Sequence, residues 1–463
     1  MLPESGKSKK LIKDNKINKK IKMKWRDCLM QNMKIYNTFE FVGTLGVAKE
    51  TEKFKPYTKN TYDSGWVKEE LKLNVKANES SEMISIADGY FDKKGYTFGR
   101  KGAKIKQEDG SFKETPDLKI AWEDRKSKTI IDKVASYQKY VLDLSNNKER
   151  YDLRQAIEKL SDDAVSDETI EELKKKFILI SGLKETKDMV ETLKEELDNL
   201  NNKKTEYLSR VDMIEDVKKL INTEQGTNTI FKITGNIVFS EWKGKVYKTF
   251  EVNRIEKATS KDKLKLSGNL DLYFTQESLD DSSFEETKKY IINAHTKTYD
   301  GQLKKQIYVP LTLVADGSRL DFNNEKHVKR LNGLIKPLKN FEDDEVIYQL
   351  PYEVKFANGS EKVEITMDDL TDYQRELIED GVLTFEEAKM DLGGDKFGDR
   401  VREIRLFKPY IKDDFMNGAV DTDLTLDDFV IIRPEKEAEK PKEEETEIDN
   451  TVDEDEEDVD DLI

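Results

Sequence analysis

Cysteine and histidine are almost absent from this sequence of 463 residues. The single cysteine, Cys28, excludes an internal disulfide and any metal site built from several thiolates. Only two histidines are present, His295 and His327, which disfavours a histidine-based catalytic or zinc centre. We therefore expect a protein that is not an enzyme and that holds neither a metal nor another cofactor.

Long apolar runs are also missing. No stretch approaches the roughly 18–20 apolar residues that a membrane-spanning helix needs, and no secretion signal with an apolar centre is visible. Apolar residues make up 36% of the chain and charged residues 38%, so modest cores must coexist with long solvated stretches. These features predict a protein of several domains in the cytoplasm.

Charge is distributed unevenly along the chain. Residues 1–33 carry 10 basic and 3 acidic side chains, whereas residues 341–433 carry 11 and 25 and residues 434–463 carry 3 and 16. The lysine-rich residues 1–33 lack apolar periodicity and are expected to be disordered. Two interpretations of this segment stay open: a basic arm for nucleic acid, or a start of translation placed too early, with Met30 or Met33 as the true start.

The segment 34–150 has the pattern of strands. Apolar residues alternate around Gly43 and within Glu70–Ala77, Met83–Phe91 is a third candidate strand, and Asp109-Gly110 predicts a turn between Tyr96–Lys106 and Ser111–Thr115. The segment 222–340 repeats this pattern. Phe231–Ile237 resembles Phe39–Leu45 at an offset of 192 residues, which indicates a duplicated β-domain. Further strands are expected at the following positions: Ile230–Glu241, Lys245–Ile255, Leu264–Phe274, and Ile307–Val314 as an edge strand because of Pro310. The first two of these strands flank a turn near Trp242-Lys243-Gly244 and are expected to form a hairpin.

The segment 151–221 between these blocks is expected to be a helical insertion. Ten positions from Val190 to Ile221 follow steps of three and four, but two of them are lysine and Asn199, Asn201 and Asn202 interrupt the pattern. A helical hairpin is therefore favoured over a long coiled coil. Ser166 is a candidate N-cap of a further helix in this segment. The acidic segment 341–433 is expected to form a small α+β domain. We predict a hairpin through Asn358-Gly359 there, and a helix that begins after Thr384 with Glu387 at the capping-box position.

The expected fold is thus strand-dominated α+β. Two OB-like β-barrel domains, 34–150 and 222–340, would flank the helical insertion and precede the acidic domain and a disordered acidic tail, 434–463. A small, partly open barrel exposes a concave face, and single-stranded nucleic acid binds such a face through cations and stacked aromatic rings. The candidate nucleic-acid-binding residues are Trp66, Lys68, Tyr96, Phe98, Arg100, Lys101, Lys104, Trp242, Lys243, Lys245, Tyr247, Lys248 and Arg254. Phe39, Phe41 and Phe231 are expected in the core instead.

The last residues carry a second candidate site. An acidic run ends in two apolar residues, a pattern that can dock into a basic-rimmed apolar pocket of a partner or occupy the protein's own basic grooves. The residues of this partner-binding tail are Asp458, Asp460, Asp461, Leu462 and Ile463. Candidate barrels followed by such a tail resemble the single-stranded DNA-binding proteins of bacteria and their phages. The resemblance implies that OB-folds coat exposed single-stranded DNA while the tail recruits replication or recombination proteins.

Three functions from different classes stay open at this point. The leading interpretation is sequence-independent binding and protection of single-stranded DNA in phage DNA replication or recombination. The second is a phage structural or assembly protein whose barrels are interaction modules. The third is a metal-dependent nuclease that uses acidic pairs such as Asp368-Asp369 or Asp413-Asp414, although no spacing distinguishes those pairs.

Overall fold

The computed structural model describes residues 37–433 apart from 49, 53, 107–110, 146, 163, 224–225, 227, 342, 364 and 392–395. The expected basic arm and the expected partner-binding tail lie outside these residues. The described part is strand-rich, with 39% strand and 30% helix, and most strands belong to one large sheet. The strand-dominated α+β class is therefore confirmed. Two separate OB-like domains are not confirmed, because strands from both expected domains are hydrogen-bonded to one another.

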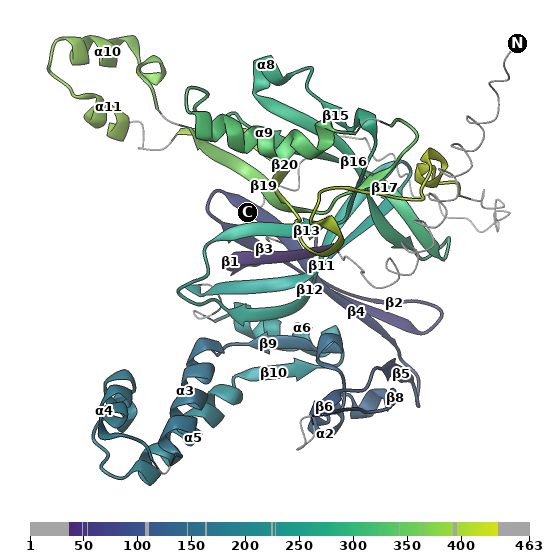
Figure 1. The fold of residues 1–463 in the computed structure, drawn as a ribbon, viewed down its shortest axis with the longest axis vertical. Coiled ribbons are helices and arrows are strands. Elements are labelled where there is room, and N and C mark those ends of the chain that lie inside the picture. The colour runs from purple at the N-terminus through teal and green to yellow at the C-terminus, as the bar shows by residue number, and fades with distance from the viewer. Residues whose placement is uncertain are drawn as a thin grey trace, which may run out of the picture. The chain divides into compact units, whose positions relative to one another are not determined.

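One set of strand pairings returns to its starting strand, and we call this set the first ring (Figure 1). Its strands are β1 (Thr38–Gly46), β3 (Trp66–Ala77), β4 (Ser80–Phe91), β12 (Lys245–Lys257) and β11 (Ile230–Trp242). Each strand pairs with the next one in that order, and β11 pairs with β1. All pairs are antiparallel except β4–β12, which are parallel and joined at only two positions, Ile84 with Phe250 and Ser85 with Glu251.

The alternation of apolar residues explains the core of this ring. Phe39, Phe41 and Phe231 are buried as expected, and the Phe41 ring centroid lies 4.8 Å from that of Phe250 on β12. The β11–β12 hairpin is also confirmed. Its two-residue turn is Lys243-Gly244, and both residues have positive φ, as the tight turn of a twisted hairpin requires.

A second ring has the same order of pairings. Its strands are β13 (Lys265–Leu270) continued by β14 (Leu272–Phe274), then β16 (Lys289–Asp300), β17 (Lys305–Asp316), β20 (Lys396–Pro409) and β19 (Tyr352–Val363). Again one neighbouring pair is parallel, β17–β20, and it meets only at Val314 and Arg405. The rings are joined where β1 pairs with β13, for example at Phe39 and Gly268.

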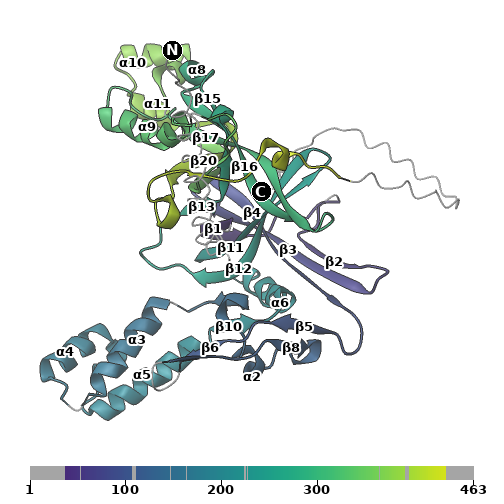
Figure 2. The same ribbon diagram turned by 45° about the vertical axis from the view of Figure 1, so that its right-hand side comes forward.

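One helix occupies the same place in the chain in each ring. Helix α6 (Arg210–Ile221) comes between β4 and β11, and helix α9 (Glu325–Lys339) comes between β17 and β19. Helix α6 contacts β3 and β4, and α9 contacts β17 and β20 (Figure 2). Each helix buries apolar residues of one face, and Val217 of α6 and Ile335 of α9 are fully buried.

These pairings correct the expected repeat. The second ring also takes strands β19 and β20 from the segment 341–433, which was expected as a separate acidic domain. Phe39–Leu45 and Phe231–Ile237 are not equivalent strands of two copies. They are antiparallel neighbours in one ring, with Phe39 opposite Gly235, so their similarity reflects a shared strand pattern.

The hairpin predicted through Asn358-Gly359 is wrong. Strand β19 runs through both residues without turning and pairs with β20 on either side of them. The glycine is needed for close approach, because a Cβ at Gly359 would lie 2.1 Å from the carbonyl oxygen of Glu79. The expected edge strand at Pro310 is observed within β17, where Pro310 faces His295 of β16.

The insertion between β4 and α6 contains both strands and helices. Its strands are β5 (Thr97–Arg100), β6 (Lys104–Lys106), β7 (Phe112–Glu114), β8 (Leu118–Ala121), β9 (Tyr140–Asp143) and β10 (Lys204–Tyr207), and its helices are α2 (Lys128–Ile131), α3 (Asn147–Leu160), α4 (Asp167–Lys176) and α5 (Thr186–Asn201). The pairing of β6 with β7 confirms the hairpin expected there, although its turn residues lie outside the described part. Ser166 caps α4 as expected, by accepting a hydrogen bond from the backbone N–H of Thr169.

The break expected near Asn199, Asn201 and Asn202 is observed, but a strand lies between the two helices of the expected helical hairpin. Helix α5 ends at Asn201, and the next residues form β10, which pairs with β9 before α6 begins. The remaining short elements are β2 (Tyr57–Thr61), β15 (Leu279–Asp280), α8 (Phe284–Thr287), β18 (Tyr348–Gln349), α10 (Asp372–Glu379), α11 (Phe385–Asp391) and β21 (Val420–Asp421). The capping box of Thr384 and Glu387 before α11 is confirmed. Within the described ranges, no helix combines the length and apolar character needed to cross a membrane.

Candidate nucleic-acid interface

A groove of about 810 Å³ lies where the two rings meet, and we call it the central groove. Strands β3, β4 and β12 of the first ring line one part of it, and β17, β19 and β20 of the second ring line the rest. Two buried polar atoms of its lining, Ser81 Oγ and Asn358 Oδ1, have no hydrogen-bond partner within the described part of the chain. Unpaired polar atoms of this kind are uncommon in folded proteins.

Three apolar side chains of the groove are accessible. Tyr247 on β12 is 49% exposed and Met83 on β4 is 37% exposed, while Phe54 in the loop before β2 is half-buried. Tyr247 is accessible because the strand alternates, so that Phe250 fills the core while Lys245, Tyr247 and Thr249 point outward. An exposed ring beside a groove is a surface on which a base can stack.

Cations of the groove are less neutralised than its anions. Lys245 and Arg402 are exposed, and Lys72 lies with its Nζ 5.9 Å from the Phe54 ring centroid. The three carboxylates of the lining all have cationic partners. Lys68 lies 3.6 Å from Glu70, Lys248 lies 3.0 Å from Glu82, and Lys289 lies 2.6 Å from Glu403. The net local charge offered to a ligand is therefore positive.

Lys248, one of the expected binding residues, has a structural role here. Its Nζ donates to Glu82 at 3.0 Å and lies 4.7 Å from the Phe250 ring centroid and 4.5 Å from that of Phe356. Burial lowers the pKa of Lys248, against the opposing effect of Glu82. Lys248 thus contacts a core phenylalanine of the first ring of strands, Phe250, and one of the second, Phe356. It is not available to a phosphate.

The tip of the β11–β12 hairpin borders a second hollow, of about 880 Å³. Trp242, which is 48% exposed, and Lys243 line it together with Leu303, Pro310 and Phe429. Pro310 also lines the central groove, so the two hollows meet at this residue. Of the expected binding residues on this hairpin, Trp242 and Lys243 thus line this hollow, and Lys245 and Tyr247 line the central groove.

The expected aromatic residues of the first block form a separate cluster. Trp66 packs against Phe91 with ring centroids 4.9 Å apart, and Tyr96 and Phe98 each lie 6.0 Å from Trp122. These aromatic side chains mainly pack against one another. They connect the first ring of strands to the β5–β8 strand pair. The cluster lies at the end of β4, about 30 Å along the strand from its first residues, which line the central groove.

The remaining expected cations are engaged elsewhere or lie apart from the groove. Arg100 donates to the carbonyl oxygen of Leu208 at 2.6 Å, Lys101 pairs with Asp117 at 2.5 Å, and Arg254 pairs with Glu256 at 2.9 Å. Lys68 carries its ion pair to Glu70, and Lys104 is exposed on β6.

Sequence reasoning missed four residues of the central groove: Phe54, Lys72, Met83 and Arg402. Lys72 and Met83 lie on strands that were correctly expected. Their positions on the outward face of those strands, which follow from strand alternation, could have indicated them as surface residues. Arg402 stands near acidic residues such as Asp399 and Glu403 in the sequence. In the structure Glu403 pairs with Arg405 and Lys289, and Arg402 lines the groove.

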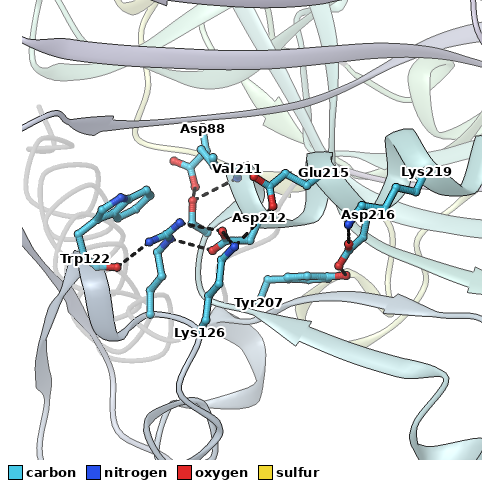
Figure 3. A network of polar contacts seen from close by, with 11 residues as sticks. Asp88, Trp122, Lys126, Tyr207, Val211, Asp212, Glu215, Asp216 and Lys219 are labelled. Atoms are coloured by element: carbon cyan, nitrogen blue, oxygen red, sulfur yellow. Dashed lines mark hydrogen bonds and ion pairs between the residues drawn. The ribbon is translucent and has the colours of Figure 1, made fainter.

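A charged network between the insertion and the first ring is the strongest alternative site (Figure 3). Arg125 and Lys126 both pair with Asp212 of α6, at 2.9 and 3.1 Å, and Tyr207 donates to Asp216 at 2.8 Å. Burial, reinforced by Asp216, raises the pKa of Tyr207 well above its usual range. Because these groups satisfy one another, we interpret the network as the attachment of the insertion to α6. No group of three or more potential metal ligands occurs within the described ranges.

Comparisons with protein-family models, with curated protein sequences and with solved structures find no match to this chain.

Proposed function

We propose that this protein binds single-stranded DNA without reading its sequence, and that the central groove is its primary contact surface. The observation that carries the proposal is the combination of the exposed Tyr247 ring with Lys72, Lys245 and Arg402 along one groove. Single-stranded nucleic acid is held by this pairing of stacking surface and positive charge.

The order of strand pairings supports the proposal. An OB-fold is a five-stranded, partly open barrel used widely for oligonucleotide binding. We propose that each ring is OB-like: three strands in succession, a helix, then a hairpin whose second strand runs parallel to the third strand. The chain order β1, β3, β4, α6, β11, β12 follows this scheme, and so does β13–β14, β16, β17, α9, β19, β20.

Direct base recognition is not part of the proposal. The groove's accessible rings and thioether can contact any base, and its three cations can contact any phosphate. The role that fits such a surface is protection of exposed DNA during replication or recombination. We propose no catalysis at the groove, because its carboxylates are occupied by cations.

The test is binding of a fluorescent oligo-dT measured by anisotropy in dilute buffer. We expect Tyr247→Ala to weaken binding by about 5- to 160-fold, which corresponds to the ~1–3 kcal/mol of one stacked base. Tyr137→Ala is the matched control, since Tyr137 is 76% exposed but does not line the groove. Absence of oligo-dT binding, or equal effects of the two variants, would refute the proposal. Cleavage of the DNA with Mg²⁺ would indicate a nuclease instead.

A further inference from the structure

Residues 420–433 cross the second ring as a segment that we call the strap. Strand β21 begins it by pairing with β18, and the backbone N–H of Thr422 donates to Ile347 at 2.9 Å. The turn 426–429 then lies against β17, where the yellow end of the ribbon is seen in Figure 1. The strap is clamped by Arg433, which lies 2.8 Å from both Glu241 and Asp300.

Only one large side chain of the turn is docked on the second ring. Phe429 stacks on His295 of β16, with ring centroids 3.8 Å apart and planes inclined by 13°. Its ring also lies 5.7 Å from that of Tyr308 on β17. The neighbouring Leu426 and Val430 are each 58% exposed, so the strap does not bury an apolar face of its own.

The geometry beneath Phe429 is that of a shelf for one flat ring. His295 supplies a parallel face, Tyr308 supplies a second aromatic wall, and Lys297 on the same strand as His295 lies with its Nζ 3.7 Å from Asp271. The shelf is continuous with the hollow beside Trp242, which Phe429 and Pro310 both line. A single-stranded DNA molecule that leaves the central groove past Pro310 would therefore reach this shelf.

We propose that His295 and Tyr308 form a second base-stacking site for single-stranded DNA, and that Phe429 occupies this site until a base displaces it. The inference rests on the proposed function and extends it to the second ring. Stacking against a flat ring needs no particular base, and a phenyl ring can fill the same space. The strap therefore covers the stacking site of His295 and Tyr308 until a base takes the place of Phe429.

Two substitutions of Phe429 test the proposal in opposite directions, in the full-length chain. Phe429→Ala removes the competitor, so oligo-dT affinity should rise by about 5-fold or more, the lower end for one stacked base. Phe429→Trp offers a larger ring to the same shelf and should lower the affinity. Leu426→Ala is the matched control on the strap and should change nothing.

NMR of the histidine rings gives an independent readout, because the chain has only His295 and His327. Saturating oligo-dT should shift the His295 ring signals in the wild-type protein and leave those of His327 in place. Unchanged His295 signals, with equal affinities of the Phe429 variants, would overturn the proposal. If oligo-dT binding still depends on Tyr247 and Arg402 in that case, the proposed function stands and only the second site is lost. If oligo-dT does not bind at all, both fail.

Discussion

Removing two cations of the central groove should change how DNA binding responds to salt. Lys245 and Arg402 are exposed and line the groove, so each is expected to neutralise one phosphate. Each such contact with single-stranded DNA contributes about 0.7 to the slope of log affinity against log salt. The double variant Lys245→Gln, Arg402→Gln should therefore reduce the magnitude of the slope by about 1.4.

The measurement is oligo-dT anisotropy at four salt concentrations between 50 and 200 mM. Salt rises fourfold over this range, and the two slopes differ by about 1.4. The affinity of the wild-type protein should therefore fall about 7-fold more than that of the double variant, because 4 to the power 1.4 is about 7. The matched control replaces Lys326 and Lys329, two exposed lysines of α9 that do not line the groove. Parallel slopes for the wild-type protein and the double variant would refute the assignment of the groove as the phosphate path.

Three further predictions concern stability, each measured by urea unfolding. Phe41→Ala should lower the free energy of unfolding by about 3–5 kcal/mol, because Phe41 is fully buried. Gly244→Ala should cost about 1–2 kcal/mol, because φ at Gly244 is +80°, and a cost near zero would contradict the turn geometry. Burial acts to raise the pKa of Glu40, but hydrogen bonds from Lys265 and Lys232 outweigh it and lower that pKa. The stabilisation by ionised Glu40 is thus present above the pKa of the unfolded chain and lost in acid. Glu40→Gln should therefore lower the free energy of unfolding at pH 7, and by less as the pH falls below about 4. A difference between the two proteins that stays constant with pH would contradict this.

The sequence was sufficient to locate most strands of the first ring and the β11–β12 hairpin. Alternation around Phe41 and the glycine at 244 are local signals, and local signals predict local structure. The sequence could not show that β1 pairs with β11 and β13, because a single sequence carries no signal for strand pairing between distant segments. The expected repeat at Phe39 and Phe231 failed for that reason.

The candidate site was predictable to a similar extent. Exposed rings at a hairpin tip, such as Trp242 and Tyr247, follow from strand alternation alone. The grouping of Trp66 with Phe91 and Trp122 in a closed cluster depends on the position of the insertion, which composition does not encode. Arg402 was missed because residues near it in the sequence are acidic, whereas in the structure it lines the same groove as Tyr247 and Lys245.

The insertion separates β4, which ends at Phe91, from its partner β12, which begins at Lys245. A ribosome that adds about 5–20 residues per second needs on the order of ten seconds or more to make residues 92–257. During that time the β3–β4 hairpin has emerged while its partner strand does not yet exist. Distant pairings also form slowly once both strands are present. Nascent chains are consequently most vulnerable to aggregation during this interval, and the insertion, with its own buried cluster around Met189 and Leu193, has time to fold first.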